Sequence, residues 1–390
     1  MFCYFPVKGL MRVGIINYRY PVFENGSQVQ ETVNSIAADS AVEQVVMMAA
    51  CYPSKNFYCP NNVSVVWVPL VTVPVLGAFV YTISLIFRGL TSEFKNVEVI
   101  NVFSARPVLA GKLLSFLLNK PIVCTIEIIN SDQGHFADKM YNLYQRIAFG
   151  QKFDQVICWS KFYADRYLSS WGVKKSSVTV IPCGIDVDLY AEPSQGQRIR
   201  EKFPKDKVLI VFAKPMYEYN RKTAELLLEA ASLIREEIPL HLLVGPGEQL
   251  DILKESVVRL KMEENVSYMN WVPFTEIPTY IEASDIIVLP FTYDPTTARS
   301  LFESLAMGKP VITTNMGEIS EILRDGVHAL IVEPEKGEVA EAIVKLTRDR
   351  NLQGKLGKNA QKLMRTKYSV QKIARKTVEL YDQVLNGHQS

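Results

Sequence analysis

Short apolar runs alternate with longer amphipathic stretches along the first half of the chain. Helical patterns begin near Ser27 and cover Val75–Arg88, Pro107–Leu118 and Lys161–Trp171. Strands that alternate with helices are typical of βαβ units, so this half predicts a parallel sheet. The predicted strands are Arg12–Asn17, Glu43–Ala49, Val63–Val68, Val97–Phe103, Ile122–Ile128, Asp154–Trp159 and Val178–Ile181.

A second series of the same kind begins at Val208, after the polar, linker-like segment Glu192–Arg200. Its later strands are Leu240–Val244, Val266–Trp271, Ile286–Pro290, Pro310–Thr314 and Ala329–Val332, and amphipathic helices follow from about Lys336. A chain of 390 residues is too long for one compact core. The pattern therefore predicts an α/β fold with two Rossmann-like domains, one of residues 1–189 and one of residues 190–369.

The stretch from Asp285 to Glu321 combines a strand, a Thr-rich turn, a helix of about Ala298–Met307 and a second strand. Parallel sheets bind ligands at the carboxyl ends of their strands, and the unpaired N–H groups of a helix start suit a phosphate. Glu303 lies between apolar neighbours on that helix, and glutamate is rarely buried without a partner. The stretch favours a nucleotide site in which the turn holds a diphosphate and Glu303 accepts hydrogen bonds from ribose hydroxyls.

The segment FESLAMGKPVITTNMGEISEILRDG resembles the carboxyl-terminal signature of the retaining, metal-independent group 1 (family four) glycosyltransferases. Glu303 is in register with the second glutamate of that signature. Pro295 stands in place of the first, which contacts the transferred sugar, so Asp294 is the substitute candidate. The resemblance implies a GT-B fold, with two Rossmann-like domains facing across a cleft and a last helix, residues 370–390, that crosses back to the first domain. The first domain would bind the acceptor and the second the nucleotide sugar.

The resemblance also implies donor-binding residues. Lys214 takes the place of the family's arginine after the first strand of the second domain, and Lys222 is in register with its lysine. Without a metal, such cations must neutralise the departing phosphate. Gly245 in the turn Gly-Pro-Gly matches the family's glycine turn. The remaining donor-binding candidates are Gly26, Thr296, Thr297, Ala298 and Arg299, although Arg299 also fits a solvated surface charge and Gly26 an ordinary turn.

The acceptor side departs from the family pattern. In the family, a histidine stands two residues after the threonine of the strand that corresponds to Ile122–Ile128. Here Glu127 stands two residues after Thr125. Glu127 stands at the carboxyl end of a predicted strand, where it could act as a base or accept a sugar hydroxyl. His135 is the other candidate, although a single loop histidine more often lies on the surface. The predicted catalytic residues are therefore Glu127, Asp294 and Glu303.

Charge and cysteine content narrow the class of protein. The formal net charge of +2 argues against a nucleic-acid partner. Six scattered cysteines without zinc-finger spacing are typical of reduced thiols in the cytoplasm. The first residues lack a basic leader and a cleavage site, so we expect no secretory signal, and Met11 is an alternative start. We expect a cytoplasmic protein, at the inner face of the membrane if the acceptor is lipid-linked.

The segment Val63–Phe87 contains no charged residue, but its prolines and Gly77 divide it into a strand, a loop and an apolar helix. Residues 75–88 are apolar on nearly every helical face. Two interpretations remain open: part of this helix contacts a membrane or a lipid acceptor, or the helix packs wholly inside the domain.

The chain predicts neither a metal nor a cofactor. Asp186 and Asp188 resemble the metal-binding pair of another glycosyltransferase fold, but their place before a polar linker favours a turn. We expect a glycosyltransferase that moves a hexose-type sugar from a UDP- or GDP-sugar to a hydroxyl of a glycan or lipid-linked acceptor. The alternative is a binding protein of the same fold that lost catalysis, because Pro295 and Glu127 replace family residues. A dehydrogenase is disfavoured because no full Gly-x-Gly-x-x-Gly follows an early strand.

Overall fold

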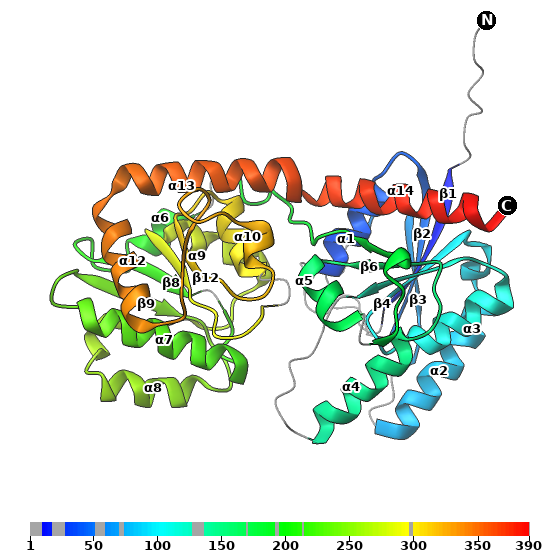
Figure 1. Ribbon diagram of the computed structural model, residues 1–390, viewed down its shortest axis with the longest axis horizontal. Helices are drawn as coiled ribbons and strands as arrows, with labels where there is room; N and C mark the ends of the chain where they lie inside the picture. The colour runs from blue at the N-terminus through cyan, green and yellow to red at the C-terminus, as the bar shows by residue number, and fades with distance from the viewer. Residues whose placement is uncertain are drawn as a thin grey trace, which may run out of the picture. The chain divides into compact units, whose positions relative to one another are not determined.

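The computed structural model describes residues 10–17, 28–50, 59–69, 74–126, 136–168, 171–191, 195–212, 214–295 and 299–389. It contains two compact units (Figure 1). Unit 1 comprises residues 1–184 and 370–390, and unit 2 comprises residues 185–369. The first change of unit lies between Gly184 and Ile185, slightly before the boundary that we expected from the sequence.

Unit 1 contains a seven-stranded sheet in the order β3-β2-β1-β4-β5-β6-β7, and every pair of neighbours is parallel. The order reverses at β1 and β4, where consecutive strands extend the sheet in opposite directions. The strands are β1 (Met11–Asn17), β2 (Val42–Ala49), β3 (Val63–Trp67), β4 (Val99–Phe103), β5 (Ile122–Ile126), β6 (Gln155–Cys158) and β7 (Val178–Val180).

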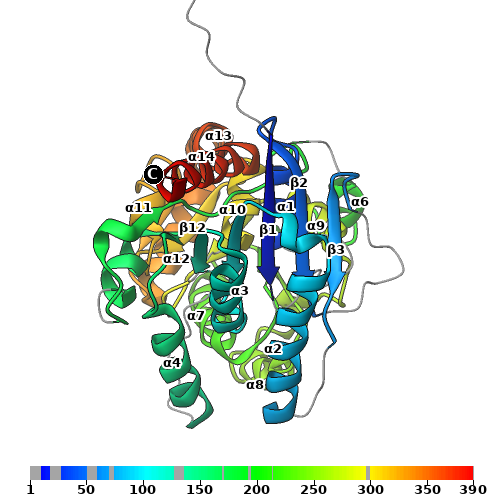
Figure 2. The same cartoon turned by 90° about the vertical axis from the view of Figure 1, so that its right-hand side faces the viewer.

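Helices cover both faces of this sheet (Figure 2). Alternate strand residues point to opposite layers: Val99 packs with α1 and α14, whereas Ile100 packs with α2, α3 and α4. Such two-sided burial explains why the strands are almost continuously apolar. The helices are α1 (Gln28–Ala37), α2 (Pro74–Thr91), α3 (Val108–Leu118), α4 (Phe136–Phe149), α5 (Lys161–Tyr163) and α14 (Val370–Gln389).

A buried polar contact fixes the carboxyl-terminal helix α14 on unit 1. The Asn101 side chain in β4 donates a hydrogen bond to the Tyr381 hydroxyl at 2.5 Å, and Thr125 donates to Asn101 at 3.0 Å. Burial raises the pKa of Tyr381, so the phenol stays protonated. The prediction that the last helix returns to the first domain is therefore confirmed.

Unit 2 contains a six-stranded parallel sheet in the order β10-β9-β8-β11-β12-β13. Its strands are β8 (Val208–Phe212), β9 (Leu240–Val244), β10 (Val266–Tyr268), β11 (Ile286–Leu289), β12 (Val311–Thr314) and β13 (Leu330–Val332). The helices are α6 (Gly196–Arg200), α7 (Glu218–Ile234), α8 (Leu250–Arg259), α9 (Ile277–Ala283), α10 (Arg299–Ala306), α11 (Ile319–Ile322), α12 (Lys336–Arg348) and α13 (Arg350–Leu363). Helices α7, α8 and α12 pack together, and α6, α9, α10 and α13 form the other layer (Figure 1). The predicted α/β class with two Rossmann-like parts is confirmed.

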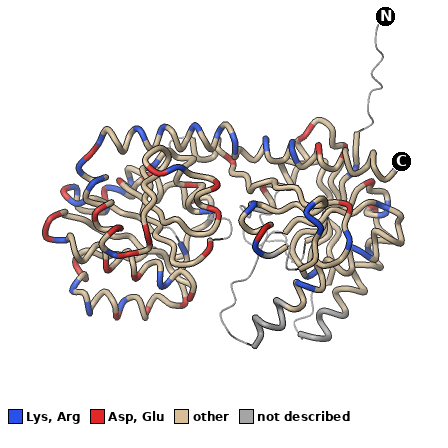
Figure 3. The backbone as a smooth tube through the Cα atoms, viewed as in Figure 1, with Lys and Arg blue, Asp and Glu red and all other residues tan. Residues whose placement is uncertain are grey.

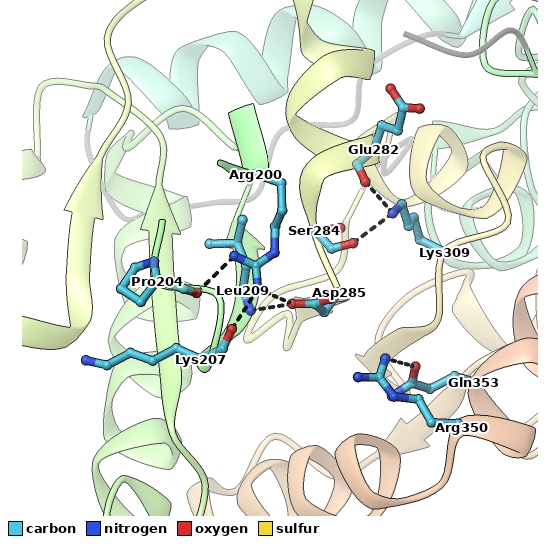
Figure 4. A network of polar contacts seen from close by, with 10 residues as sticks. All are labelled: Arg200, Pro204, Lys207, Leu209, Glu282, Ser284, Asp285, Lys309, Arg350 and Gln353. Carbon is cyan, nitrogen blue, oxygen red and sulfur yellow. Dashed lines mark hydrogen bonds and ion pairs between the residues drawn. The ribbon is translucent and has the colours of Figure 1, made fainter. Parts of the chain in front are cut away.

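The segment Glu192–Arg200 is more than the linker that we expected. Its last residues form α6, which packs on α9, and the Gly196 amide donates to the Glu282 carboxylate at 2.8 Å. Figure 4 shows Arg200 donating to the carbonyls of Pro204 and Lys207 and pairing with Asp285 at 3.3 Å. This network ties the start of unit 2 to the amino ends of β8 and β11.

Lys309 belongs to the same edge of the sheet. Its ammonium group donates to the carbonyls of Glu282 and Ser284 at 2.5 and 2.7 Å, which satisfies carbonyls left open at the end of α9 (Figure 4). Burial lowers the pKa of Lys309. Lys309 therefore has a structural role at the amino end of β12, although it lies within the signature that resembles the glycosyltransferase family.

In the described part of the chain, no helix combines the length and the apolar character needed to cross a bilayer.

Candidate functional site

The strand order of unit 2 reverses between β8 and β11, which pair directly. Lys214 follows the carboxyl end of β8, and Phe291 to Tyr293 follow the end of β11. Open α/β sheets bind ligands outside the carboxyl ends of their strands at such a reversal. These two loops, with the helix α10 that follows β11, form the candidate site.

Glu303 is the central carboxylate of this site. Its side chain lies in α10 and is 3% exposed. Oε1 accepts a hydrogen bond from the Tyr190 hydroxyl at 3.0 Å and another from Nε of Arg299 at 2.8 Å. Among the described residues, both bonds fall on the same oxygen, so Oε2 remains available to accept hydroxyl hydrogen bonds. A buried carboxylate with two donors and one open oxygen suits recognition of a diol such as ribose.

Lys214 lies close enough to Glu303 for the carboxylate to influence its charge. Desolvation lowers the pKa of Lys214 to about 8, and the negative charge of Glu303 opposes this shift. Nζ lies 5.0 Å from the centre of the Phe291 ring, where the ring face attracts a cation. A lysine held among apolar groups interacts strongly with an anion, because little water screens its charge. The predicted pair of Lys214 and Glu303 thus shares one environment.

The turn Gly-Pro-Gly after β9 holds the backbone of Lys214. A side chain at Gly245 would place its first carbon 2.3 Å from the Lys214 carbonyl oxygen, and at Gly247, where φ is +156°, 2.5 Å from the Met216 nitrogen. The Met216 amide also donates to the Pro246 carbonyl at 2.7 Å. Gly245 therefore allows the close approach of the Lys214 segment, and the direct donor contact expected from the sequence stays a prediction.

Asn220 and Thr223 join the two loops of the site, and the sequence analysis did not identify either. Asn220 is 1% exposed; its amide nitrogen donates to the Pro215 carbonyl, and its oxygen accepts from the Tyr293 hydroxyl, both at 2.7 Å. The Thr223 hydroxyl lies 3.3 Å from that of Thr292. These contacts fix the loop after β8 against the loop after β11. The signal in the sequence was an Asn and a Thr near the start of a predicted helix, which also fits ordinary capping.

The start of α10 offers hydrogen-bond donors at the same edge of the sheet. Ser300 is 8% exposed, and among the described residues its hydroxyl has no hydrogen-bond partner. The helix begins at Arg299, whose guanidinium pairs with Glu303 rather than pointing into solvent. First-turn N–H groups with a positive end of the helix dipole suit an anionic ligand.

The remaining predicted residues fall into two groups: those that the structure describes and those that lie outside the described residues. Lys222 is exposed on α7, and its side chain forms neither a hydrogen bond nor an ion pair with any described residue. Asp294 is half-buried directly before the buried Pro295. Six candidates lie outside the described residues, namely Gly26, Glu127, His135, Thr296, Thr297 and Ala298.

Asp186 caps a turn. Its carboxylate accepts from the amides of Asp188 and Leu189 at 3.1 and 3.4 Å, in agreement with the turn inferred from the sequence. Within the described ranges, no group of three His, Cys, Asp or Glu side chains is placed to hold a metal ion.

Two family models match the chain and together cover most of both units. Residues 207–349 match the model described as "Glycosyl transferases group 1", and residues 38–189 match "Glycosyltransferase Family 4". The chain belongs to the group 1 glycosyltransferases. The first match includes Lys214, Asn220 and Glu303, so the family assignment covers the candidate site itself.

This group 1 glycosyltransferase is similar to several curated proteins. It is 27% identical over 244 residues to mannosylfructose-phosphate synthase of Agrobacterium fabrum, covering 59% of this chain and 53% of the relative. It is 26% identical over 253 residues to alpha-monoglucosyldiacylglycerol synthase of Streptococcus pneumoniae, covering 60% and 56%. The chain thus spans little more than half the length of these relatives.

Solved structures show the fold of this group 1 glycosyltransferase over nearly its full length. Anabaena HepE in complex with UDP and glucose aligns with a TM-score of 0.78 at 17% identity, covering 96% of this chain and 100% of the other. Sucrose-phosphate synthase from Thermosynechococcus elongatus aligns with a TM-score of 0.79 at 18% identity, covering 97% and 100%. The architecture is therefore the two-domain GT-B fold.

Proposed function

We propose that the protein is a retaining, metal-independent glycosyltransferase that moves a hexose-type sugar from a nucleoside diphosphate sugar to a hydroxyl acceptor. The observation that carries the proposal is the shared environment of Lys214 and Glu303 at the strand-order reversal of unit 2. An ammonium group beside a helix start can neutralise a diphosphate, and the open oxygen of Glu303 can accept ribose hydroxyls.

Each residue of the site has a proposed role in this reaction. Lys214 stabilises the charge that gathers on the departing diphosphate, with Lys222 as a second cation and the start of α10 as a set of N–H donors. Asp294 contacts the transferred sugar. Glu127 serves the acceptor hydroxyl on unit 1, and no cofactor takes part. Because these cations lie on the protein itself, the leaving group requires no divalent ion.

The acceptor is proposed to be a glycan or a lipid-linked hydroxyl. One relative is named for a sugar phosphate and another for a glucosylated diacylglycerol, which support these two acceptor classes. A lipid-linked acceptor would place the enzyme at the cytoplasmic face of a membrane as a peripheral protein. UDP-sugars are the first donors to test, because the aligned HepE structure contains UDP.

The test is nucleotide release from UDP- and GDP-sugars by Glu303→Gln and Lys214→Met, with and without crude lipid extract. Both substitutions should lower donor affinity and turnover by about tenfold or more, because each removes a charged partner. Glu338→Gln, at an exposed position of α12, is the matched control and should leave both quantities unchanged. Wild-type affinity and turnover in both site variants would remove the assignment.

Two further measurements address the finer parts of the proposal. NMR of the product shows whether the anomeric configuration of the sugar is retained, and activity after treatment with a chelator tests independence from metal. The second candidate function, nucleotide-sugar binding without catalysis, is favoured by Pro295 in place of the family's first glutamate. Tight donor binding without nucleotide release under any acceptor condition would support that candidate instead.

A further inference from the structure

One layer of unit 1 exposes large apolar side chains on three neighbouring helices. Helix α3 packs against both α2 and α4, and together they cover one side of the sheet. Phe116 on α3 is 81% exposed, and Phe87 on α2 is 62% exposed. We call this layer the α2–α4 face; its exposed apolar residues are Ile83, Phe87, Leu90, Leu109, Leu113, Phe116, Leu117, Leu143 and Ile147. Scattered single apolar residues are normal on a surface, but a continuous group indicates a binding surface.

The charged residues of α2 and α3 are all basic. Helices α2 and α3 contain Arg88 and Lys112 and no aspartate or glutamate, and Lys120 follows α3 (Figure 3). Unit 2 offers a contrast, because the helices that expose Leu233 and Val258 also carry several acids. An apolar surface with basic residues is complementary to anionic lipid headgroups, whereas an apolar surface among acids is not.

A surface groove of about 600 Å³ continues the face at the end of α3. Its apolar wall includes Leu113 and Phe116, and its basic groups are Lys112, Lys120 and His388. Lys112 donates to the carbonyl of Lys152, and its positive charge also interacts with the carboxylate of Asp154. Asp154 also lines the groove; its carboxylate accepts from the Ile122 amide at 2.7 Å and offsets part of the positive charge of the two lysines. Basic pockets next to apolar surface suit the phosphate of a lipid headgroup.

We propose that the α2–α4 face docks on a bilayer that contains anionic phospholipids, with a headgroup phosphate in the groove at Lys112 and Lys120. The apolar side chains enter the boundary between headgroups and acyl chains, and the cations attract the surface. This inference adds a membrane-binding surface to the proposed function at a membrane, and it does not depend on the proposed glycosyl transfer. It also places the centre of the contact on α3, whereas the sequence suggested residues 75–88 of α2.

A second copy of the chain is a weaker occupant of the same face. An isologous dimer would place each patch against its own equivalent, so Arg88, Lys112 and Lys120 of the two copies would face like charges. Like charges across an interface oppose association, whereas an anionic bilayer supplies the opposite charge.

The test is flotation of the full chain with vesicles of phosphatidylcholine alone or with added phosphatidylglycerol. The wild type should bind the anionic vesicles more strongly. Leu113→Ser with Phe116→Ser should abolish most binding to both. Arg88→Gln with Lys120→Gln should weaken binding to the anionic vesicles by about tenfold or more, because each cation near the surface contributes to the attraction. The control Leu233→Ser with Val258→Ser changes exposed apolar residues of unit 2 and should bind as the wild type does.

Three outcomes would overturn the inference: equal binding to both vesicle types, wild-type binding by the α3 variant, or a wild-type dimer that the α3 variant dissociates. Circular dichroism and UDP affinity, measured on every variant, show that folding and the candidate site are intact. Vesicle binding that follows the predicted pattern in a protein without transferase activity would reject the proposed function alone. Transferase activity in a protein that ignores vesicles would reject the docking surface alone.

Discussion

The Tyr190 hydroxyl donates a hydrogen bond to Oε1 of Glu303 at 3.0 Å, across 113 positions of the chain. Both side chains are buried, and Tyr190 belongs to the first turn of unit 2 after the chain leaves unit 1. The contact fixes one oxygen of the carboxylate and so orients the other. Tyr190, which directly follows the change from unit 1 to unit 2, therefore helps to position Glu303, the residue proposed to bind ribose.

Tyr190→Phe should weaken nucleotide binding without preventing folding. The substitution keeps the aromatic packing and removes one of the two donors to Glu303, so the carboxylate loses part of its orientation. A hydrogen bond to a charged group contributes about 1.5–3 kcal/mol, so we expect a loss of donor affinity of about tenfold or more. Calorimetric titration with UDP measures it, and Tyr268→Phe, in β10, is the control. An unchanged affinity would show that Tyr190 has only a packing role.

The affinity for a nucleoside diphosphate should decrease as the pH rises through the pKa of Lys214, which desolvation lowers to about 8. Below that pH the amine is cationic and attracts the diphosphate; above it the amine is neutral. An anion in the site favours the charged form, so binding should also be accompanied by proton uptake near pH 8. Calorimetry in two buffers with different ionisation enthalpies detects this uptake.

Lys214→Arg is the informative variant for this pH dependence. Arginine remains charged over the whole range, so its affinity should stay constant between about pH 7 and 9.5. The wild type and Lys222→Arg should both keep the decrease, because both retain Lys214. A decrease of the same size in Lys214→Arg would assign the titration to another group.

Most of the fold could be predicted from the sequence because buried parallel strands are continuous apolar runs with sharp ends. Strands such as Ile286–Leu289 differ from the expected ranges by one or two residues. Helix α4 was not predicted, since Phe136–Phe149 follows a polar loop and mixes charged and apolar residues. Residues Gly196–Arg200 looked like a linker because the contacts that order them, to Glu282 and Asp285, come from distant positions.

The candidate site was predictable only where one residue carries the signal. Glu303 is a rare buried acid within an apolar helix, so its own surroundings identified it, whereas Lys214 was identified through its register in the resemblance to the glycosyltransferase family. Asn220 and Tyr190 act through partners far along the chain, which a local pattern cannot indicate. The sequence also could not indicate that Gly245 allows two backbone segments to approach, because that contact forms only in the folded unit.

His241 should make the protein less stable at mildly acidic pH. It lies in β9 with Nε2 2.8 Å from the Ser267 hydroxyl, and burial lowers its pKa, with Lys207 and Arg200 acting in the same direction. The imidazole of the unfolded state therefore takes up a proton near pH 6.5, whereas that of the folded state takes it up only at lower pH. The free energy of unfolding therefore decreases as the pH drops below about 6.5.

His241→Gln removes this titration and keeps a polar group near Ser267. The free energy of unfolding of the variant should change less between pH 7.5 and pH 5.5 than that of the wild type, as measured by urea denaturation. His328→Gln is a useful comparison, because His328 is only partly buried. Desolvation nevertheless lowers its pKa in the same direction as that of His241. An identical pH dependence in His241→Gln and the wild type would contradict the prediction.

Gln145→Met should stabilise the protein. Gln145 is fully buried in α4, and among the described residues neither its amide oxygen nor its nitrogen has a hydrogen-bond partner. A buried polar group without a partner costs about 1–3 kcal/mol, and methionine has a similar length without that cost. Urea denaturation should show an increase in the free energy of unfolding of this size.

Gln151→Met is the control: Gln151 is exposed and donates to the Ile147 carbonyl at 3.0 Å, so its substitution should not stabilise the protein. If Gln145→Met destabilises unit 1 instead, the amide has a partner in the folded protein, and α4 depends on that contact.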